Sequence, residues 1–141
     1  MIREAFQSDL GALIALARQF DAASQYGEWD AFNGSVVQEM LQDMLDDPMS
    51  RIFVTDDRQA AIGVTLAPSL KSGALMRLER FWYADPSKRG VGMRLYRAAD
   101  AWATAQGAEI RSLVCPWKAP EVRALYERMG YEPVEITWVK R

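Results

Sequence analysis

Apolar residues recur along the chain at two different spacings, and the changes between them divide the sequence into helices and strands. Helical spacing predicts helices over residues 8–20, 35–46, 92–106 and 120–129. Alternating or continuous apolar runs predict strands over residues 2–5, 51–55, 59–67, 74–84 and 109–115. The alternating pattern returns at residues 131–139 and predicts one or two closing strands.

The connections between these strands predict a mixed sheet. Short turns at residues 56–58 and 69–73 join consecutive strands, which favours an antiparallel meander. The strand at 109–115 follows a long helix, as in a βαβ unit, and is expected to lie parallel to the strand at 74–84. No internal repeat or linker interrupts the chain, so residues 1–141 are interpreted as one α+β domain.

Composition narrows the chemistry. The chain has 17 lysine and arginine residues against 19 aspartate and glutamate residues, so we expect no basic face for nucleic acid. It has no histidine, which excludes histidine-based triads and most zinc sites, and we expect no metal. Acid–base chemistry must then use carboxylates, tyrosine, lysine, cysteine or water. The single cysteine, Cys115, ends a predicted buried strand and is interpreted as a small apolar filler.

The sequence also predicts where the protein resides. No apolar run is long enough to cross a bilayer, and the first residues lack the apolar core of a signal peptide. We therefore expect a cytoplasmic protein without a membrane partner.

The turn between the strand at 74–84 and the helix at 92–106 has the form of an anion site. It contains Gly90 and Gly92, with the basic residues Lys88 and Arg89 beside them. Amide groups at a helix start lack intrahelical partners, and glycine lets a phosphate approach them closely. An ordinary solvated turn has the same composition, so phosphate binding and a simple helix start are both open on these residues alone.

Two motifs in this element order resemble those of the GNAT-type N-acetyltransferase family, and the resemblance covers nearly the whole chain. Asp85-Pro86 followed by Arg89-Gly90-Val91-Gly92 is similar to the family's acyl-CoA pyrophosphate loop, [QR]-x-x-G-x-[GA]. Residues 125–131, Leu-Tyr-Glu-Arg-Met-Gly-Tyr, resemble its Y-[ED]-[KR]-x-G-[FY] signature. The resemblance implies a mixed, mostly antiparallel sheet of about six to seven strands, splayed between the fourth and fifth, with about four helices.

The resemblance also implies acetyl-CoA as co-substrate. Main-chain groups of the glycine turn would bind its pyrophosphate: Ser87, Lys88, Arg89, Gly90, Val91, Gly92 and Met93. The end of the preceding strand would pair with its pantetheine arm: Trp82, Tyr83 and Ala84. Two departures matter. When Gly90 and Gly92 take the glycine positions, Ser87 falls where the family has arginine or glutamine; when Pro86 and Arg89 are aligned instead, Arg94 stands where the last glycine should be. The asparagine that often contacts CoA before the last helix would align near Ala119 and is missing. These departures leave open a module of this fold that binds CoA or a protein without catalysis.

In the implied reaction a primary amine attacks the thioester directly, and CoA leaves as thiolate. Tyr126 matches the tyrosine that often serves the family as general acid. For the base we choose Glu79, because a carboxylate inside an apolar, aromatic strand is costly unless it is paired or used. Its arginine neighbours Arg77 and Arg80 give the alternative, a simple ion pair.

The acceptor is the least defined part of the prediction. Tyr26 and Trp29, in the irregular segment 21–34, are expected to line its pocket, although aromatics there can equally cover the edge of the core. The partner is then an acyl-CoA with a small amine or a protein N-terminus, and an excess of acidic residues favours a cationic acceptor. Family habit suggests a homodimer through the closing strands. A small nucleotide-phosphate binder is the third hypothesis.

Overall fold

The computed structural model describes residues 1–85, 87–88 and 90–141. Its helices are α1 (Leu10–Ala22), α2 (Gly34–Asp46), α3 (Val91–Ala105) and α4 (Pro120–Arg128), with short 3-10 turns η1 (Gln7–Asp9) and η2 (Tyr26–Glu28). Its strands are β1 (Ile2–Glu4), β2 (Ser50–Thr55), β3 (Ala61–Pro68), β4 (Leu75–Tyr83) and β5 (Ile110–Ser112). The four predicted helices are thus confirmed, with small shifts at their ends.

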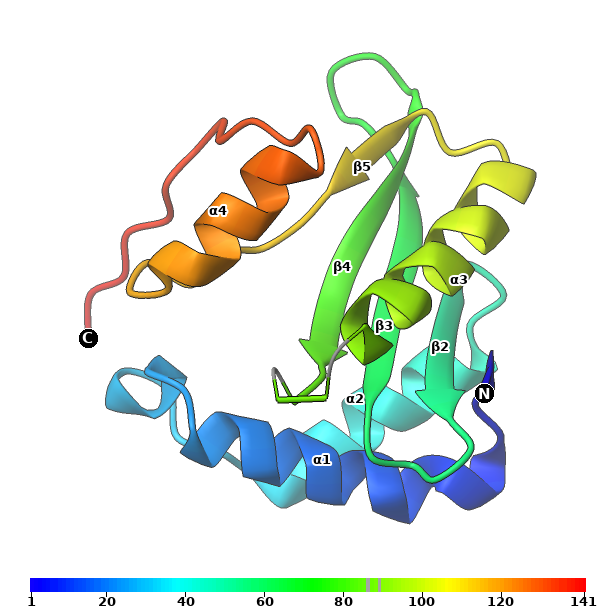
Figure 1. Cartoon of the computed structure of the whole chain (residues 1–141), viewed down its shortest axis with the longest axis vertical. Coiled ribbons are helices and arrows are strands. Elements are labelled where there is room, and N and C mark those ends of the chain that lie inside the picture. Colours follow the sequence, from blue (N-terminus) through cyan, green and yellow to red (C-terminus); the bar gives the residue numbers. More distant parts are fainter. Residues whose placement is uncertain (86, 89) are drawn as a thin grey trace.

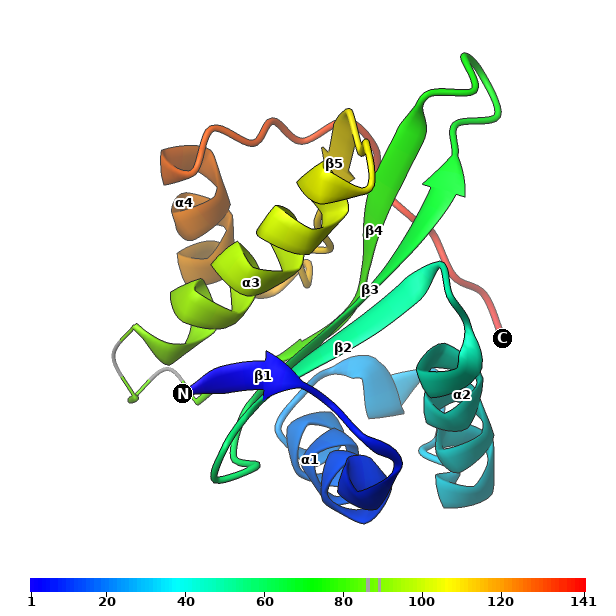
Figure 2. The same ribbon diagram turned by 90° about the vertical axis from the view of Figure 1, so that its right-hand side faces the viewer.

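The strands form one sheet in the order β1-β2-β3-β4-β5. β1 to β4 pair antiparallel, whereas β5 lies parallel to β4, which confirms the predicted meander and the βαβ unit. Helices α1 and α2 cover one face of the sheet and α3 covers the other, as Figures 1 and 2 show. Each face has its own core, one around Leu13, Leu41 and Phe81, and the other around Ile62 and Leu95.

The prediction of six to seven strands is wrong for the described residues, whose sheet has five. β5 is limited to Ile110–Ser112 instead of the predicted 109–115, and residues 131–141 form no strand. A strand needs a partner edge for its backbone groups, and a three-residue edge strand offers few. Alternate apolar side chains of the last segment, Val134 and Trp138, are 89% exposed. The sequence pattern was therefore that of a strand without a partner.

A β-bulge in β4 decides which side chains share a face. Gly63 pairs with Phe81 and Val64 with Glu79, so Arg80 is the additional residue of β4. Because cross-strand partners lie on the same face, Glu79 shares the face of Val64, on the α3 side, while Phe81 packs on the α1–α2 side. Gly63 must lack a side chain because an added Cβ would overlap the ring of Phe81.

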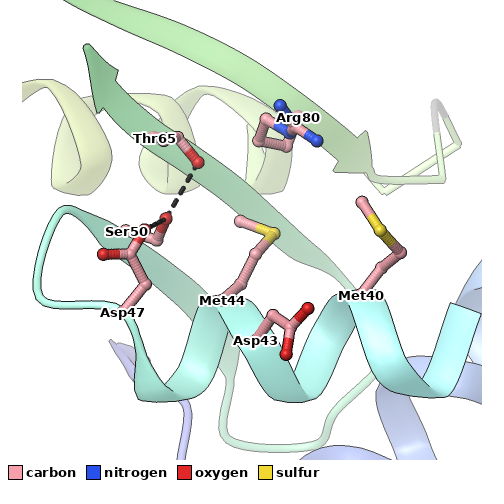
Figure 3. A pocket seen from close by; sticks show the side chains of 7 residues that line it. All are labelled: Met40, Asp43, Met44, Asp47, Ser50, Thr65 and Arg80. Carbon is pink, nitrogen blue, oxygen red and sulfur yellow. Dashed lines mark hydrogen bonds between the residues drawn. The ribbon is translucent and has the colours of Figure 1, made fainter.

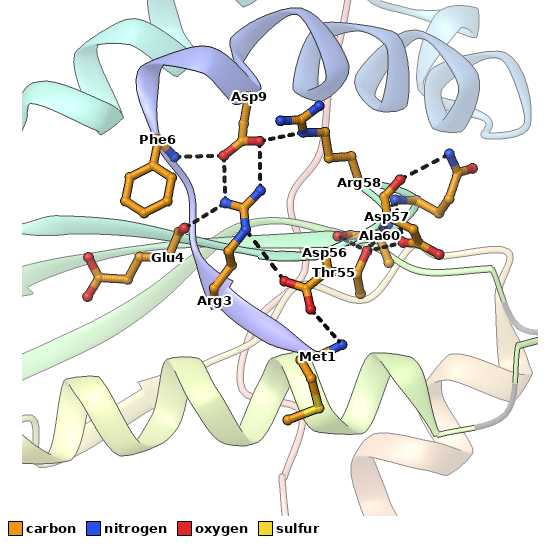
Figure 4. A network of polar contacts seen from close by, with 11 residues as sticks. Met1, Arg3, Glu4, Phe6, Asp9, Thr55, Asp56, Asp57, Arg58 and Ala60 are labelled. Carbon is orange, nitrogen blue, oxygen red and sulfur yellow. Dashed lines mark hydrogen bonds and ion pairs between the residues drawn. The ribbon is translucent and has the colours of Figure 1, made fainter.

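An ion cluster fastens the start of the chain to the β2–β3 turn (Figure 4). The carboxylate of Asp9 is fully buried and accepts hydrogen bonds from Arg3 at 2.8 and 3.0 Å and from Arg58 at 2.7 Å. It also accepts from the Phe6 amide at 2.8 Å. Hydrogen bonding to Arg3, more than any other contact, holds the pKa of Asp9 well below its usual range, against the effect of burial.

We predict that Asp9→Asn lowers the free energy of unfolding at pH 7 by about 3 kcal/mol, because it leaves buried donors with a weaker partner. The lowered pKa of Asp9 makes this contribution fully present above the unfolded-state pKa and lost as the pH falls below about 4. Urea unfolding between pH 3 and 7 measures it. The wild type should lose stability on acidification more steeply than the variant, and parallel curves would contradict the assignment.

Candidate functional site

β4 and β5 separate partway along their length. Their backbone pairing spans only Met76–Leu78 against Ile110–Ser112, although β4 continues to Tyr83. Beyond Ser112 the chain leaves the sheet and leads to α4 (Figure 1). We call the region where they part, residues 79–83 of β4 and residues 113–115, the fork. Backbone groups of β4 that face β5 have no ladder partner there, so an extended ligand can pair with them.

Glu79 is the first residue of β4 beyond this pairing. One of its carboxylate oxygens accepts a hydrogen bond from the Val114 amide at 2.9 Å, which spans the fork. Burial raises the pKa of Glu79 to about 7, and the Val114 amide and the charge of Arg77 only partly oppose this. Within the described residues Glu79 makes no ion pair, since Arg77 pairs with Asp100 instead. A carboxylate with this pKa suits proton uptake near neutral pH.

Tyr126 of α4 also contacts Val114. Its hydroxyl donates to the Val114 carbonyl at 2.9 Å, so Val114 contacts Glu79 through its amide and Tyr126 through its carbonyl. The ring lies parallel to Trp82 of β4, with centroids 6.2 Å apart. Burial, and next the charge of Glu79, raise the pKa of Tyr126 far above its ordinary value. The phenol therefore stays protonated and can donate.

The two residues predicted to line the acceptor pocket lie together in and beside η2. Tyr26 and Trp29 meet edge to face, with ring centroids 5.9 Å apart. Burial raises the pKa of Tyr26, and the charges of Glu79 and Cys115 add to this, which places Tyr26 within electrostatic range of the fork. Trp29 is 37% exposed and lies at the surface. The structure thus brings Tyr26 toward Glu79 and Tyr126, and leaves Trp29 as its neighbour.

Cys115 lies at the fork as well. Its thiol is half-buried, and burial raises its pKa, so it is neutral at pH 7. Its Sγ lies 3.5 Å from the Pro116 carbonyl. A cysteine nucleophile is activated by groups that lower the pKa of its thiol, whereas the surroundings of Cys115 raise that pKa.

The glycine turn leads from the end of β4 into α3. Gly90 is the N-cap of α3 and has φ +80°, a left-handed conformation that favours glycine. The Ser87 and Lys88 amides already donate to Asp85, at 2.9 and 3.0 Å. Val91 donates to the Lys88 carbonyl over a long 3.4 Å. Of the predicted pyrophosphate amides, those in the first turn of α3 remain best suited to a ligand; Arg89 lies outside the described residues.

The first turn of α3 packs on the strand residues that were predicted to hold pantetheine. A Cβ added to Gly92 would lie 3.4 Å from the Cβ of Ala84 and 3.6 Å from the indole nitrogen of Trp82. That nitrogen is buried and has no hydrogen-bond partner among the described residues. Tyr83 points the other way and stacks on Phe20 and Phe81. Its burial raises the pKa of Tyr83 to about 12. Any contact of Tyr83 with a pantetheine would therefore be through its backbone.

A hollow lies on the α2 side of the sheet, the face opposite to that of Glu79 (Figure 3). Its volume is about 360 Å³, and it is lined by Met40, Asp43, Met44, Asp47, Ser50, Thr65 and Arg80. A smaller hollow of about 160 Å³ shares Met40, Met44 and Arg80 and reaches Tyr83. Here Arg80, the bulge residue, is separated from Glu79, its neighbour in sequence, because the two project to different faces.

Two further observations concern only the part of the chain that the structure describes. Its Cys, Asp and Glu side chains nowhere form a group of three that could hold a metal ion. Its helices are all too short or too polar to span a membrane.

Sequence reasoning missed Arg77, which is fully buried in β4 and bonds to Asp100 of α3 and to Tyr131 beyond α4. The signal was an arginine at an inward position of a predicted strand, which was considered only as a partner for Glu79. Tyr131 was noticed as part of the C-terminal motif but was given no role.

Comparisons with known proteins agree on the fold. No protein-family model matches the chain. An uncharacterized N-acetyltransferase of Bacillus subtilis, YhfO, is 29% identical over 136 residues, covering 93% of this chain and 89% of that protein. The structure of AAC(6')-Iy in complex with the bisubstrate analog CoA-S-monomethyl-acetylneamine matches with TM-score 0.79 at 16% identity, covering 100% of this chain and 96% of that one. A putative acetyltransferase from Agrobacterium tumefaciens matches with TM-score 0.76 at 20% identity, covering 100% and 99%.

Proposed function

We infer that this chain, as a member of the GNAT-type N-acetyltransferase family, transfers the acetyl group of acetyl-CoA to a primary amine. The observation that carries this proposal is the pair at the fork. Glu79, with a pKa of about 7, and Tyr126, a protonated phenol, both bond to Val114 where β4 and β5 separate. Acyl transfer from a thioester requires a base for the amine and an acid for the leaving thiolate, and these two residues meet at Val114 beside the unpaired edge of β4.

Acetyl-CoA would lie along the fork with its pyrophosphate at the start of α3. The first amides of α3 and the positive end of the helix dipole favour a diphosphate there. Gly90 provides the left-handed turn, and Gly92 lets the first turn of α3 pack closely on Ala84 and Trp82. The free backbone edge of β4 beyond Leu78 would accept and donate hydrogen bonds to the pantetheine amides. AAC(6')-Iy, a protein of the same fold, is in complex with a CoA-containing bisubstrate analog, which supports acetyl-CoA as the ligand.

The reaction is proposed as direct attack. Glu79 takes the proton from the acceptor ammonium, directly or through water, and the free amine attacks the thioester carbon. A backbone amide of β4 in the fork stabilises the tetrahedral oxyanion. As the carbon–sulfur bond breaks, Tyr126 turns its hydroxyl from the Val114 carbonyl and protonates the leaving thiolate. As the intermediate collapses, its nitrogen loses its second proton through water to solvent, which gives the neutral amide. The acetylated amine and CoA then depart, Glu79 releases its proton to solvent, and the tyrosine regains a proton from solvent.

Calorimetric titration with acetyl-CoA tests the binding step. We expect saturable binding at micromolar concentrations, and no heat at high micromolar ligand would remove the proposal. Release of CoA thiol across a panel of amines then separates an enzyme from a module that only binds CoA or a protein. Competition by ATP tests the nucleotide-phosphate alternative, which predicts that ATP displaces CoA.

Replacing Gly92 with valine should weaken acetyl-CoA binding by about tenfold. A Cβ there already touches Ala84 and the indole of Trp82, and the two methyl groups of valine beyond it would crowd this contact at the start of α3. Gly11→Ala is the matched control, since an added Cβ there meets nothing within 4 Å. Titration calorimetry of both variants gives the two affinities. Equal affinities would contradict a pyrophosphate site at the first turn of α3.

The acceptor is proposed to be a primary amine of a small molecule or of a protein N-terminus that enters beside Tyr26. A tyrosine edge and a neighbouring indole suit the hydrocarbon part of such an amine. Acidic residues of this side, Asp21 among them, favour a cation, and the charge of Asp21 reaches Tyr83 at the end of β4. Rates with polyamines compared with neutral monoamines test the preference for charge.

A homodimer through the last segment is proposed as well. Residues 131–141 keep the alternating pattern of a strand but have no strand partner in the described chain, and Val134, Ile136 and Trp138 are largely exposed. Pairing of this segment with a second copy would cover these side chains. Light scattering gives the mass in solution, and a monomer at high micromolar concentration would contradict it.

A further inference from the structure

Arg77 connects β4 to α3 and to the segment beyond α4, although its side chain is fully buried. One guanidinium nitrogen donates to Asp100 of α3 at 2.8 Å, and another donates to the hydroxyl of Tyr131, beyond α4, at 2.8 Å. The guanidinium also lies over the ring of Tyr96, 4.9 Å from its centroid. Its two terminal nitrogens are thus paired, while its Nε has no hydrogen-bond partner among the described residues. A buried arginine is costly unless it is paired, so the contacts to Asp100 and Tyr131 hold the guanidinium in place.

The contact of Arg77 with Asp100 lies where the pairing of β4 and β5 ends, at the start of the fork. Arg77 is the direct partner of Arg111 across β4 and β5, and two like charges in that position repel. Asp100 removes the conflict, because the same carboxylate oxygen accepts from Arg77 and, at 2.6 Å, from Arg111. The next pair, Leu78 with Ser112, is the last before the strands separate. The ion cluster therefore fixes where the fork begins.

A second set of contacts connects Arg77 with Tyr126, the proposed general acid. Tyr131 accepts from Arg77 and shares a 2.6 Å hydrogen bond with the hydroxyl of Tyr96. Its ring lies 6.2 Å from that of Tyr126, centroid to centroid. Since α4 has no residue in the buried core, these contacts at its end are a main restraint on its position.

The contacts form a closed circuit around the fork. From Arg77 it runs through Tyr131 and Tyr126 to Val114, and from Val114 to Glu79, which stands two residues after Arg77 in the same strand. Arg77 thus lies in the same strand as the proposed base, Glu79, and is connected through Tyr131 to the proposed acid, Tyr126.

We propose that Arg77 is a positioning residue for acetyl transfer, which acts through Tyr131 to hold Tyr126 across Val114 from Glu79. This inference rests on the proposed function. It assigns Arg77 no contact with substrate: its hydrogen bonds go to Asp100 and Tyr131, and the step it supports is the delivery of a proton by Tyr126.

The charge of Arg77 gives the proposal a second readout. It lowers the pKa of Glu79, against burial, which raises it. The other titratable groups whose charges couple to Glu79 come from η2, the end of β4, the chain after β5, and α4: Tyr26, Tyr83, Cys115 and Tyr126. Tyrosine and cysteine are neutral at pH 7 at their ordinary pKa values, and burial raises the pKa of each of these groups further. Arg77 is therefore the charged group that acts on the base there.

Tyr131→Phe is the principal test, because it removes one hydroxyl and keeps the charge of Arg77. We expect kcat to fall about tenfold while KM for acetyl-CoA changes less than about twofold, since a misplaced acid slows chemistry without touching the pyrophosphate site. The acidic limb of the pH profile should stay in place. Arg77→Lys should lower kcat similarly, and Arg77→Met should in addition move the acidic limb to higher pH.

Arg58→Met is the control, because Arg58 belongs to the ion cluster of Asp9 and contributes nothing to the fork. It should lower the melting temperature and leave kcat unchanged. Full kcat in both Tyr131→Phe and Arg77→Lys, or a rise in KM alone, would overturn the proposal. If Arg77→Met does not fold, the other two variants decide.

Failure of the proposed function would be seen separately. A wild type that neither binds acetyl-CoA nor releases thiol contradicts the enzyme itself. The role of Arg77 has a readout that needs no turnover, because NMR titration of carbon-13-labelled glutamate reports the pKa of Glu79 directly. That pKa should be higher in Arg77→Met than in the wild type and unchanged in Tyr131→Phe. An unchanged pKa of Glu79 in Arg77→Met would overturn the inference that the charge of Arg77 acts on the base.

Discussion

Glu79→Gln should lower kcat/KM for the amine by about a hundredfold or more at pH 8, because a general base contributes on this scale and glutamine cannot accept the proton. The wild-type profile should rise with pH through about 7, where Glu79 becomes ionised and able to act. The variant should lack that limb. Steady-state rates between pH 5.5 and 9 measure both.

The same substitution should make the protein more stable. Folding raises the pKa of Glu79 from 4.5 to about 7, so ionised Glu79 opposes folding above the unfolded-state value. Glutamine keeps an acceptor for the Val114 amide without the charge, and should raise the free energy of unfolding at pH 8 by roughly 2 kcal/mol. A gain in stability with a loss of rate distinguishes a functional carboxylate from a structural one.

Glu39→Gln provides the control for both measurements, since Glu39 is an exposed residue of α2. It should change neither the rate nor the stability. If Glu79→Gln retains the rate and the acidic limb of the wild type, another group is the base.

Tyr126→Phe should lower kcat by about a hundredfold and leave the affinity for acetyl-CoA unchanged, because the lost hydroxyl serves the leaving thiolate and not the bound ground state. Stacking on Trp82 needs only the ring and should keep α4 in place. Calorimetry gives the affinity, and thiol release under saturating acetyl-CoA gives kcat. A tighter or weaker complex with unchanged kcat would assign Tyr126 to binding instead.

The order of effects follows from the geometry. Glu79 and Tyr126 would touch reacting atoms, whereas Arg77 acts through Tyr131 and affects only the placement of one of them. We therefore expect the loss in Tyr131→Phe to be smaller than the loss in Tyr126→Phe. The double variant should lose no more than Tyr126→Phe alone, because a positioning residue has nothing left to position once the hydroxyl is gone.

The sequence predicted most of the fold because its signals were local. Apolar spacing defined the four helices, and the turn at 56–58 and the strand–glycine–helix order defined the meander and the βαβ unit. The prediction of closing strands was wrong because strand formation also depends on residues far away in the sequence. Residues 131–139 have the pattern of a strand, but pattern alone provides no partner edge, and β5 is too short to provide one.

The site was predicted unevenly for a similar reason. Glu79 stood out as a carboxylate in an aromatic strand, and the resemblance to the family identified Tyr126. Neither feature indicated that both would contact Val114, because that depends on where β4 and β5 separate. The bulge at Arg80, which places Glu79 on its face, leaves no trace in composition. Arg77 was missed because its partners lie 23 and 54 residues away along the chain.

A crystal structure of the chain with acetyl-CoA tests the central claim most directly. We expect the diphosphate at the first turn of α3, pantetheine along β4 beyond Leu78, and the thioester sulfur within about 3.5 Å of the Tyr126 hydroxyl, as proton transfer requires. A diphosphate bound elsewhere, or a fork still closed by its own side chains with the cofactor on another surface, would contradict it.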